Sequence, residues 1–139
     1  MVFQNFSLLD RLNVYDNVAF PMKSWGYKKK EIDERVRELI GLVDLNDKIS
    51  AFPPYLSGGQ KQRVAIGRAL INEPDIIFGD EPTGSLDRKT TGDVMRCMKQ
   101  MNQRSGISFL LVTHDAYTAS FCDRVLFLQD GNLAKEVKK

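Results

Sequence analysis

LSGGQKQR at residues 56–63 and IIFGDEPTG at residues 76–84 are the stretches that decide the fold of this 139-residue chain. The first places two glycines where a helix is expected to begin, and the second places Asp80 and Glu81 at the end of an apolar run. Free N–H groups at a helix start bind anions, and α/β folds place ligands at the carboxyl ends of strands. The two stretches therefore predict an α/β protein with sites for a phosphate and a metal ion.

The composition is that of an ordinary globular protein and excludes several function classes. Hydrophobic residues make up 42% and charged residues 27% of the chain, which is long enough for one domain with a hydrophobic core. The net charge of +2 gives no basic surface for nucleic acid, and Lys28, Lys29 and Lys30 are interpreted as a solvated helix start. No apolar stretch is long enough to cross a bilayer, and residues 1–4 do not have the features of a signal peptide.

The cysteines and the single histidine argue against a structural metal site. Cys97 and Cys122 lack metal-ligand spacing and are expected to be reduced thiols of a cytoplasmic protein. His114 cannot form a multi-histidine site by itself. The cytoplasm is therefore the expected compartment.

Hydrophobic periodicity and chain breakers predict an α/β layer with a helical insertion near its start. Val2 and Phe3 resemble the end of a strand. Helices are predicted at residues 14–23, 29–43, 59–70, 88–103 and 116–121, with Ser57 as the cap of the third. Strands of the buried parallel type are predicted at residues 75–78 and 107–113, and a hairpin at residues 124–129 and 132–137. Residues 5–70 then form a helical part, and residues 71–139 continue the α/β core.

Each motif also has a plainer interpretation. Ser57 followed by glycines is common in capped helices whose glycines are merely flexible, and Asp80 with Glu81 also fits a surface acidic pair at a strand end. A lone histidine such as His114 is usually structural. The functional interpretation depends on these motifs occurring together and in a fixed order.

In that order, the motifs resemble those of the ATP-binding subunits of ABC transporters. The correspondences are residues 56–63 with the signature motif, residues 76–84 with Walker B, Ser85-Leu86-Asp87 with the D-loop, Gln4 with the Q-loop glutamine and His114 with the switch histidine. The resemblance covers nearly the whole chain. It implies an incomplete P-loop NTPase fold with a parallel sheet core and an α-helical subdomain, lacking the Walker A strand and helix.

The resemblance also implies a role for each motif residue. Glu81 would act as the catalytic base, and His114 would contact the phosphoryl group being transferred. The metal residues for Mg²⁺ would be Gln4 and Asp80, and the ATP-binding residues would be Ser57, Gly58, Gly59, Gln60 and Asp87.

The resemblance implies two partners: a second ATP-binding subunit, expected to be another copy of the same chain in a homodimer, and a membrane permease. The protein would lie in the cytoplasm at the inner face of the cell membrane and would have no nucleic-acid partner. Residues 13–54 are expected to face the permease. Tyr15, Phe20, Trp25 and Tyr27 are candidate contacts, and burial of one or two of them in the core fits equally well.

Finer features resemble a branch of the family that exports antimicrobial peptides, macrolides and lipoproteins. FQNFSLL at residues 3–9 and EPTGSLD at residues 81–87 carry this likeness, and VTHDAY at residues 112–117 resembles the bacitracin-resistance type. Gly79 departs from the family pattern, which often has a larger residue before the metal-binding Asp80. This glycine is expected to weaken its strand slightly.

The chain contains no Gly-x4-Gly-Lys-Ser/Thr string, the P-loop that holds the phosphates of ATP in this family. The phosphate cradle, the metal and the base act as a unit, so the chain alone is expected to bind little or no ATP and Mg²⁺ and to lack ATPase activity. Loss of the P-loop strand is expected to leave a gap or an open edge and to favour dimers or larger assemblies. The intact protein would bind and hydrolyse ATP to drive export or antimicrobial-peptide resistance. The alternative is a natural non-catalytic short form that regulates a full ATPase or a permease.

Overall fold

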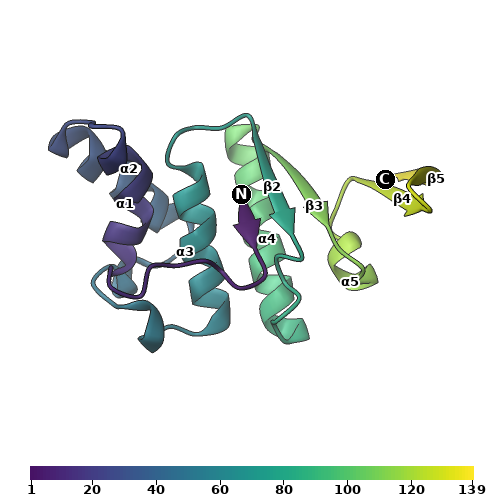
Figure 1. The fold of residues 1–139 in the computed structure, drawn as a ribbon, viewed down its shortest axis with the longest axis horizontal. Helices are drawn as coiled ribbons and strands as arrows, with labels where there is room; N and C mark the ends of the chain where they lie inside the picture. Colours follow the sequence, from purple (N-terminus) through teal and green to yellow (C-terminus); the bar gives the residue numbers. More distant parts are fainter.

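Three parallel strands form the central sheet of the protein, whose computed structural model describes residues 1–139. Strand β2 (Ile76–Asp80) lies in the middle, between β1 (Val2–Phe3) and β3 (Ser108–Val112). An antiparallel pair, β4 (Arg124–Gln129) and β5 (Asn132–Lys138), forms a separate hairpin at one end of the molecule (Figure 1). The strands predicted from the sequence are all present.

Helices α1, α2 and α3 are grouped at the end of the molecule opposite the hairpin (Figure 1). The helix bounds are α1 Val14–Ser24, α2 Lys29–Leu42, α3 Gly58–Leu70, α4 Arg88–Ser105 and α5 Ala116–Ala119, with short 3-10 turns at Asn46–Lys48 and Pro53–Tyr55. All five predicted helices are confirmed, and their ends differ only slightly from the prediction. No helix combines the length and the apolar character that crossing a bilayer requires.

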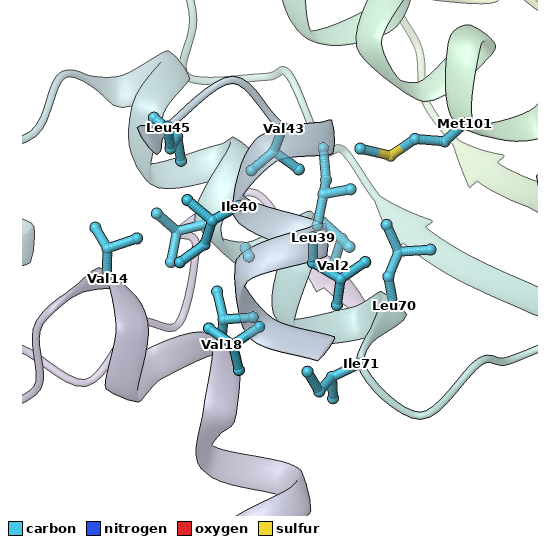
Figure 2. Close-up of a cluster of buried hydrophobic side chains, with 14 of the residues drawn as sticks. Val2, Val14, Val18, Leu39, Ile40, Val43, Leu45, Leu70, Ile71 and Met101 are labelled. Atoms are coloured by element: carbon cyan, nitrogen blue, oxygen red, sulfur yellow. The ribbon is translucent and has the colours of Figure 1, made fainter. Parts of the chain in front are cut away.

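The hydrophobic core extends from the junction of α1, α2 and α3 to one side of α4 and to buried residues of β1 and β2 (Figure 2). The residues of α2 and its C-terminal cap that the apolar spacing predicted to share one face are all buried: Ile32, Val36, Leu39, Ile40 and Val43. They pack with Val14 and Val18 of α1 and with Leu70 of α3. Burying one such side chain contributes about 1.5–3 kcal/mol relative to leaving it exposed. This core therefore fixes α3, the helix that begins at the glycine-rich stretch.

Only one face of the sheet is covered, which corrects the expectation that β2 and β3 are strands of the fully buried type. Ile77 is buried, whereas Ile76, Phe78, Leu110 and Val112 expose large parts of their side chains. Parallel strands become buried on both faces when helices cover both sides of a sheet. Here the side chains of β2 alternate between a covered face and an open one.

Gly79 has a packing role that the sequence did not reveal. It pairs with Leu111 in the sheet, and a Cβ atom at Gly79 would lie 2.7 Å from Cδ2 of that leucine. The methyl group of Leu111 thus fills the space that a side chain at this position would need. The small residue in β2 is matched to its neighbour on β3.

Asn17 is a fully buried polar residue that ties the segment after β1 to helix α1. Its Oδ1 accepts a hydrogen bond from the N–H of Leu9 at 2.9 Å. Its Nδ2 donates to the carbonyl oxygens of Leu9, Leu12 and Asn13 at 3.0, 2.9 and 3.1 Å. Buried backbone groups need such partners. Asn17 therefore fixes the path of the chain from the sheet into the helical part.

Replacing Asn17 with alanine is expected to lower the free energy of unfolding by about 1–3 kcal/mol, because buried backbone groups lose their partners. Urea unfolding measures the change. Asn72→Ala is the control, since Asn72 is exposed and its replacement should change the free energy by no more than about 0.5 kcal/mol. Equal effects of the two substitutions would contradict the role given to Asn17.

Candidate functional site

Glu81 turns the chain away from the sheet directly after β2. Its backbone lies in the left-handed region, with φ of 45°, which costs a residue with a side chain about 1–2 kcal/mol. Its N–H donates to the carbonyl oxygen of Val112 at 2.9 Å, and this bond holds Glu81 beside the end of β3. Strained backbone that is held by its surroundings is found preferentially at functional sites.

The carboxylate of Glu81 receives three hydrogen-bond contacts from the residues that follow β3. Oγ1 of Thr113 donates to Oε2 at 3.0 Å, and the backbone N–H of His114 donates to Oε1 at 2.9 Å. Nδ1 of His114 lies 2.6 Å from the same Oε1. The two residues proposed as catalytic, Glu81 and His114, are therefore in direct contact.

These contacts determine the ionisation of Glu81. Burial raises the pKa of Glu81, but the hydrogen bonds from His114 and Thr113 outweigh burial, so the pKa lies below its ordinary value. The group is thus an ionised acceptor, able to orient a water molecule. The side chain of His114 is 88% exposed, so the ring beside Glu81 is accessible to a ligand.

Asp80, at the edge of the sheet where β2 and β3 end, is the residue whose side chain suits a magnesium ion. Its carboxylate is exposed at the end of β2, and Mg²⁺ prefers carboxylate oxygens together with water and phosphate oxygens. No group of three or more histidine, cysteine, aspartate or glutamate residues in the structure is arranged to hold a metal ion. An ion bound to Asp80 would therefore take most of its other ligands from water or from a nucleotide.

Gln4 lies at the same edge of the sheet, because β1 ends with Phe3 opposite Asp80. Its side chain packs against the turn after Glu81, where a Cβ atom on Gly84 would lie 3.0 Å from Nε2 of Gln4. Oγ of Ser85 donates to the backbone carbonyl oxygen of Gln4 at 3.2 Å. The structure thus places Gln4 close to Asp80, the candidate metal ligand, and shows that the side-chain amide of Gln4 packs against Gly84.

Ser57 caps helix α3, as the sequence predicted. Its hydroxyl accepts the N–H of Gln60 at 3.3 Å, and Oε1 of Gln60 accepts the N–H of Ser57 at 2.9 Å. This reciprocal arrangement is a capping box. It leaves the N–H groups of Gly58 and Gly59 at the positive end of the helix for an anion.

The two glycines are packed, which corrects the plainer interpretation of them as flexible. A Cβ atom on Gly58 would lie 2.9 Å from Cδ2 of Leu86, and a Cβ atom on Gly59 would lie 2.4 Å from Cγ2 of Thr90. Their lack of side chains lets the start of α3 approach the start of α4. The signature stretch and the D-loop are therefore neighbours in the folded protein.

Asp87 is the N-terminal cap of α4. Its Oδ1 accepts the N–H of Thr90 at 3.0 Å, and its Oδ2 accepts the hydroxyl of Thr90 at 2.6 Å. The hydroxyl bond is the main reason that the pKa of Asp87 lies below its ordinary value, followed by the bond from the N–H. The structure thus places Asp87 beside the glycines and shows its carboxylate engaged in capping.

Gln62 links helix α3 to the turn that follows Glu81. It was not identified as a site residue from the sequence. It is fully buried, its Nε2 donates to the carbonyl oxygen of Pro82, and its Oε1 has no hydrogen-bond partner. Gln62 is one helical turn before the buried Ile66 and lies on the same face of α3. A polar residue on an otherwise apolar face is the sequence signal that could have identified Gln62. Thr113 and the buried pair Thr83 and Thr118 were also missed.

Comparisons with known proteins show the family of this chain. The family model described as ABC transporter matches residues 1–84. The methionine import ATP-binding protein MetN of Clostridium acetobutylicum is 47% identical over 132 residues, which cover 94% of this chain and 41% of that protein. MetN of Carboxydothermus hydrogenoformans is 44% identical over 137 residues, covering 98% and 41%. The chain thus spans about two fifths of the length of these curated relatives.

Solved structures confirm the predicted fold class. The ATP-binding cassette MJ0796, solved as a dimer in a post-hydrolysis state with ADP and Pi, aligns with a TM-score of 0.80 and 38% identity over 99% of this chain and 61% of its own. The protein cbiO1 of Clostridium perfringens, part of the ABC transporter complex cbiONQ, aligns with a TM-score of 0.91 and 29% identity over 99% and 55%. The names of the curated relatives describe import, so they do not bear out the export branch expected from residues 3–9, 81–87 and 112–117.

Two substitutions at Gln62 should lower the free energy of unfolding by different amounts. Gln62→Met removes the bond to Pro82 together with the unpaired oxygen, and should lower the free energy of unfolding by about 0.5–1.5 kcal/mol. Gln62→Glu places a carboxyl group in the same buried position without a donor, and should cost about 3 kcal/mol or more. Urea unfolding at neutral pH measures both, and an equal or reversed order would contradict the buried position of Gln62.

The cap at Asp87 should make stability depend on pH. Because the folded-state pKa lies below the ordinary value of 3.8, the ionised cap stabilises the fold above that pH, and the contribution is lost as the pH falls through the lower folded value. Asp87→Asn keeps a cap that does not titrate. The stability difference between the two proteins should therefore shrink below about pH 4 in unfolding experiments. A difference that stays constant through this range would refute the assignment.

Proposed function

Because this chain belongs to the ABC transporter ATP-binding family, we propose that it forms part of a subunit that hydrolyses ATP to drive transport across a membrane. The single observation that carries the proposal is the cluster at the ends of β2 and β3, where Thr113 and His114 hold the carboxylate of Glu81. An ionised carboxylate with two oriented donors at a sheet edge suits the attack of water on a phosphoryl group.

In this proposal, each residue at the sheet edge has a separate task. Glu81 orients and polarises the attacking water, and the exposed ring of His114 contacts the phosphoryl group. Asp80 holds Mg²⁺, with Gln4 beside it. The ion, when bound, neutralises charge that develops on the phosphate oxygens.

The start of α3 supplies a second, anion-binding group of residues. The N–H groups of Gly58 and Gly59 and the hydroxyl of Ser57 lie at the positive end of that helix, where a terminal phosphate is favoured. We propose that they contact a nucleotide held by a second ATP-binding subunit. The relative MJ0796 was solved as a dimer bound to ADP and Pi, which supports a paired arrangement. Gln60 and Asp87 then serve this site as caps that fix the two helix starts.

A membrane permease is the other proposed partner, with the protein at the cytoplasmic face of the membrane. Phe20, Trp25 and Tyr27 lie at α1 and just beyond its end and expose much of their rings, and Trp25 is 70% exposed. Exposed aromatic side chains are enriched at protein interfaces. Tyr15 is partly buried against the core and is a weaker candidate.

The direction of transport is not part of the proposed function, which is ATP-driven transport. EPTGSLD at residues 81–87 resembles an export branch, whereas the curated relatives are named for methionine import. In this proposal the permease selects the solute. Uptake and export assays on the intact transporter separate the two directions.

Glu81→Gln in the whole protein should lower the rate of ATP hydrolysis by roughly 100- to 10,000-fold, because the amide cannot act as a base. Binding of ATP should persist, since Glu81 is not among the residues proposed to bind it. Steady-state hydrolysis and fluorescent-nucleotide binding measure the two effects.

Glu34→Gln on the exposed surface of α2 is the matched control and should leave both values unchanged. If Glu81→Gln hydrolysed ATP at the wild-type rate, Glu81 would not be the base. A whole wild-type protein that binds its partners and hydrolyses no ATP would instead favour a non-catalytic interaction partner.

A further inference from the structure

A buried pair of threonines connects the two loops that carry Glu81 and His114. Thr83 follows Glu81 in the turn after β2, and Thr118 lies in α5, the short helix that begins after His114. Their hydroxyl oxygens are 2.8 Å apart, and both residues are almost completely buried. This pair is the only side-chain bond between buried residues that joins the two loops.

Asp115 sets the direction of this hydrogen bond. Oγ1 of Thr118 donates to Oδ2 of Asp115 at 2.7 Å. A hydroxyl group has one proton to donate, so Thr118 accepts the bond from Thr83. The carboxylate of Asp115 also accepts the N–H groups of Tyr117 and Thr118 at 3.1 and 2.9 Å and thereby caps α5. The hydrogen bonds thus run from Thr83 through Thr118 to Asp115.

The same series of hydrogen bonds continues from Asp115 through Thr113 to Glu81. The N–H of Asp115 donates to Oγ1 of Thr113 at 3.1 Å, and Oγ1 of Thr113 donates to Oε2 of Glu81 at 3.0 Å. His114 lies between Thr113 and Asp115 in the sequence, so the ring of contacts holds its backbone on both sides. The hydrogen bonds and the chain between Glu81 and Thr83 thus form a closed circuit that includes both sequence neighbours of His114.

On the basis of the ATPase function proposed above, we propose that Thr83 and Thr118 are positioning residues that hold the imidazole of His114 against the carboxylate of Glu81. They act through Asp115 and touch neither the nucleotide nor the attacking water. Buried hydrogen bonds suit this task, because an unpaired hydroxyl in the same place is costly and the paired geometry is therefore well defined. Displacing a catalytic group by a small distance lowers the reaction rate strongly.

The test compares Thr83→Val and Thr118→Val with Thr118→Ser in the full-length protein. Both valine variants should lower kcat roughly 10- to 100-fold, with KM changed by less than about twofold, because they move a catalytic group without touching the nucleotide. Thr118→Ser keeps the hydroxyl and should retain most of the activity. Thr91→Val is the matched control, since Thr91 is a buried threonine of α4 outside this network, and it should leave kcat unchanged.

A second measurement does not depend on hydrolysis. The side-chain and backbone ¹⁵N signals of His114, identified by their loss in His114→Gln, report its two contacts with Glu81. In both valine variants, the Nδ1 signal should move towards that of a free imidazole, and exchange of the His114 amide proton should accelerate by about tenfold or more. Neither signal should change in Thr91→Val or Thr118→Ser.

Unchanged His114 signals and unchanged kcat in the valine variants would overturn the positioning role, even if those variants were less stable. If Thr118→Val does not fold, Thr83→Val decides, because it removes only one donor. If the His114 signals move in the valine variants but the wild-type protein hydrolyses no ATP, the positioning role is supported and the proposed ATPase function is wrong.

Discussion

The register between β2 and β3 is the constraint on which the rest of the site depends. Asp80 pairs with Val112, so the residues that follow the two strands leave the sheet at the same edge and Glu81 meets Thr113 and His114. A slip by one residue would turn every side chain of the strand to the opposite face. The left-handed backbone of Glu81 is tolerated because the same register supplies the carbonyl of Val112 as its partner.

Close approach joins the helical part to this edge of the sheet. Gly58 and Gly59 let the start of α3 pack against Leu86 and Thr90, and Gln62 reaches from α3 to the carbonyl of Pro82. The start of α3 therefore cannot move without disturbing the turn that follows Glu81. Contiguous contacts of this kind can carry coupling between sites, and here they connect the start of α3, proposed to bind an anion, with the residues at the sheet edge.

Buried polar side chains mark the junctions between elements. The buried polar residues are Asn17, Gln62, Thr83, Thr91 and Thr118. Asn17 joins the segment after β1 to α1, Gln62 joins α3 to the turn after β2, and Thr83 joins that turn to α5 through Thr118. Apolar side chains fill the core without fixing directions, whereas hydrogen bonds fix where one element meets another.

Short-range patterns were enough to predict the helices, the strands, the cap at Ser57 and the position of Glu81 and His114 at strand ends, because periodicity, capping and turn chemistry act between residues close in the chain. Four features became visible only in the folded protein: one face of the sheet stays open, Gly59 packs on Thr90, Asp87 caps α4, and Thr83 contacts Thr118. An apolar run has the same appearance in the sequence whether one face or both are covered. Contacts between residues far apart in the chain exist only once the sheet register has brought them together.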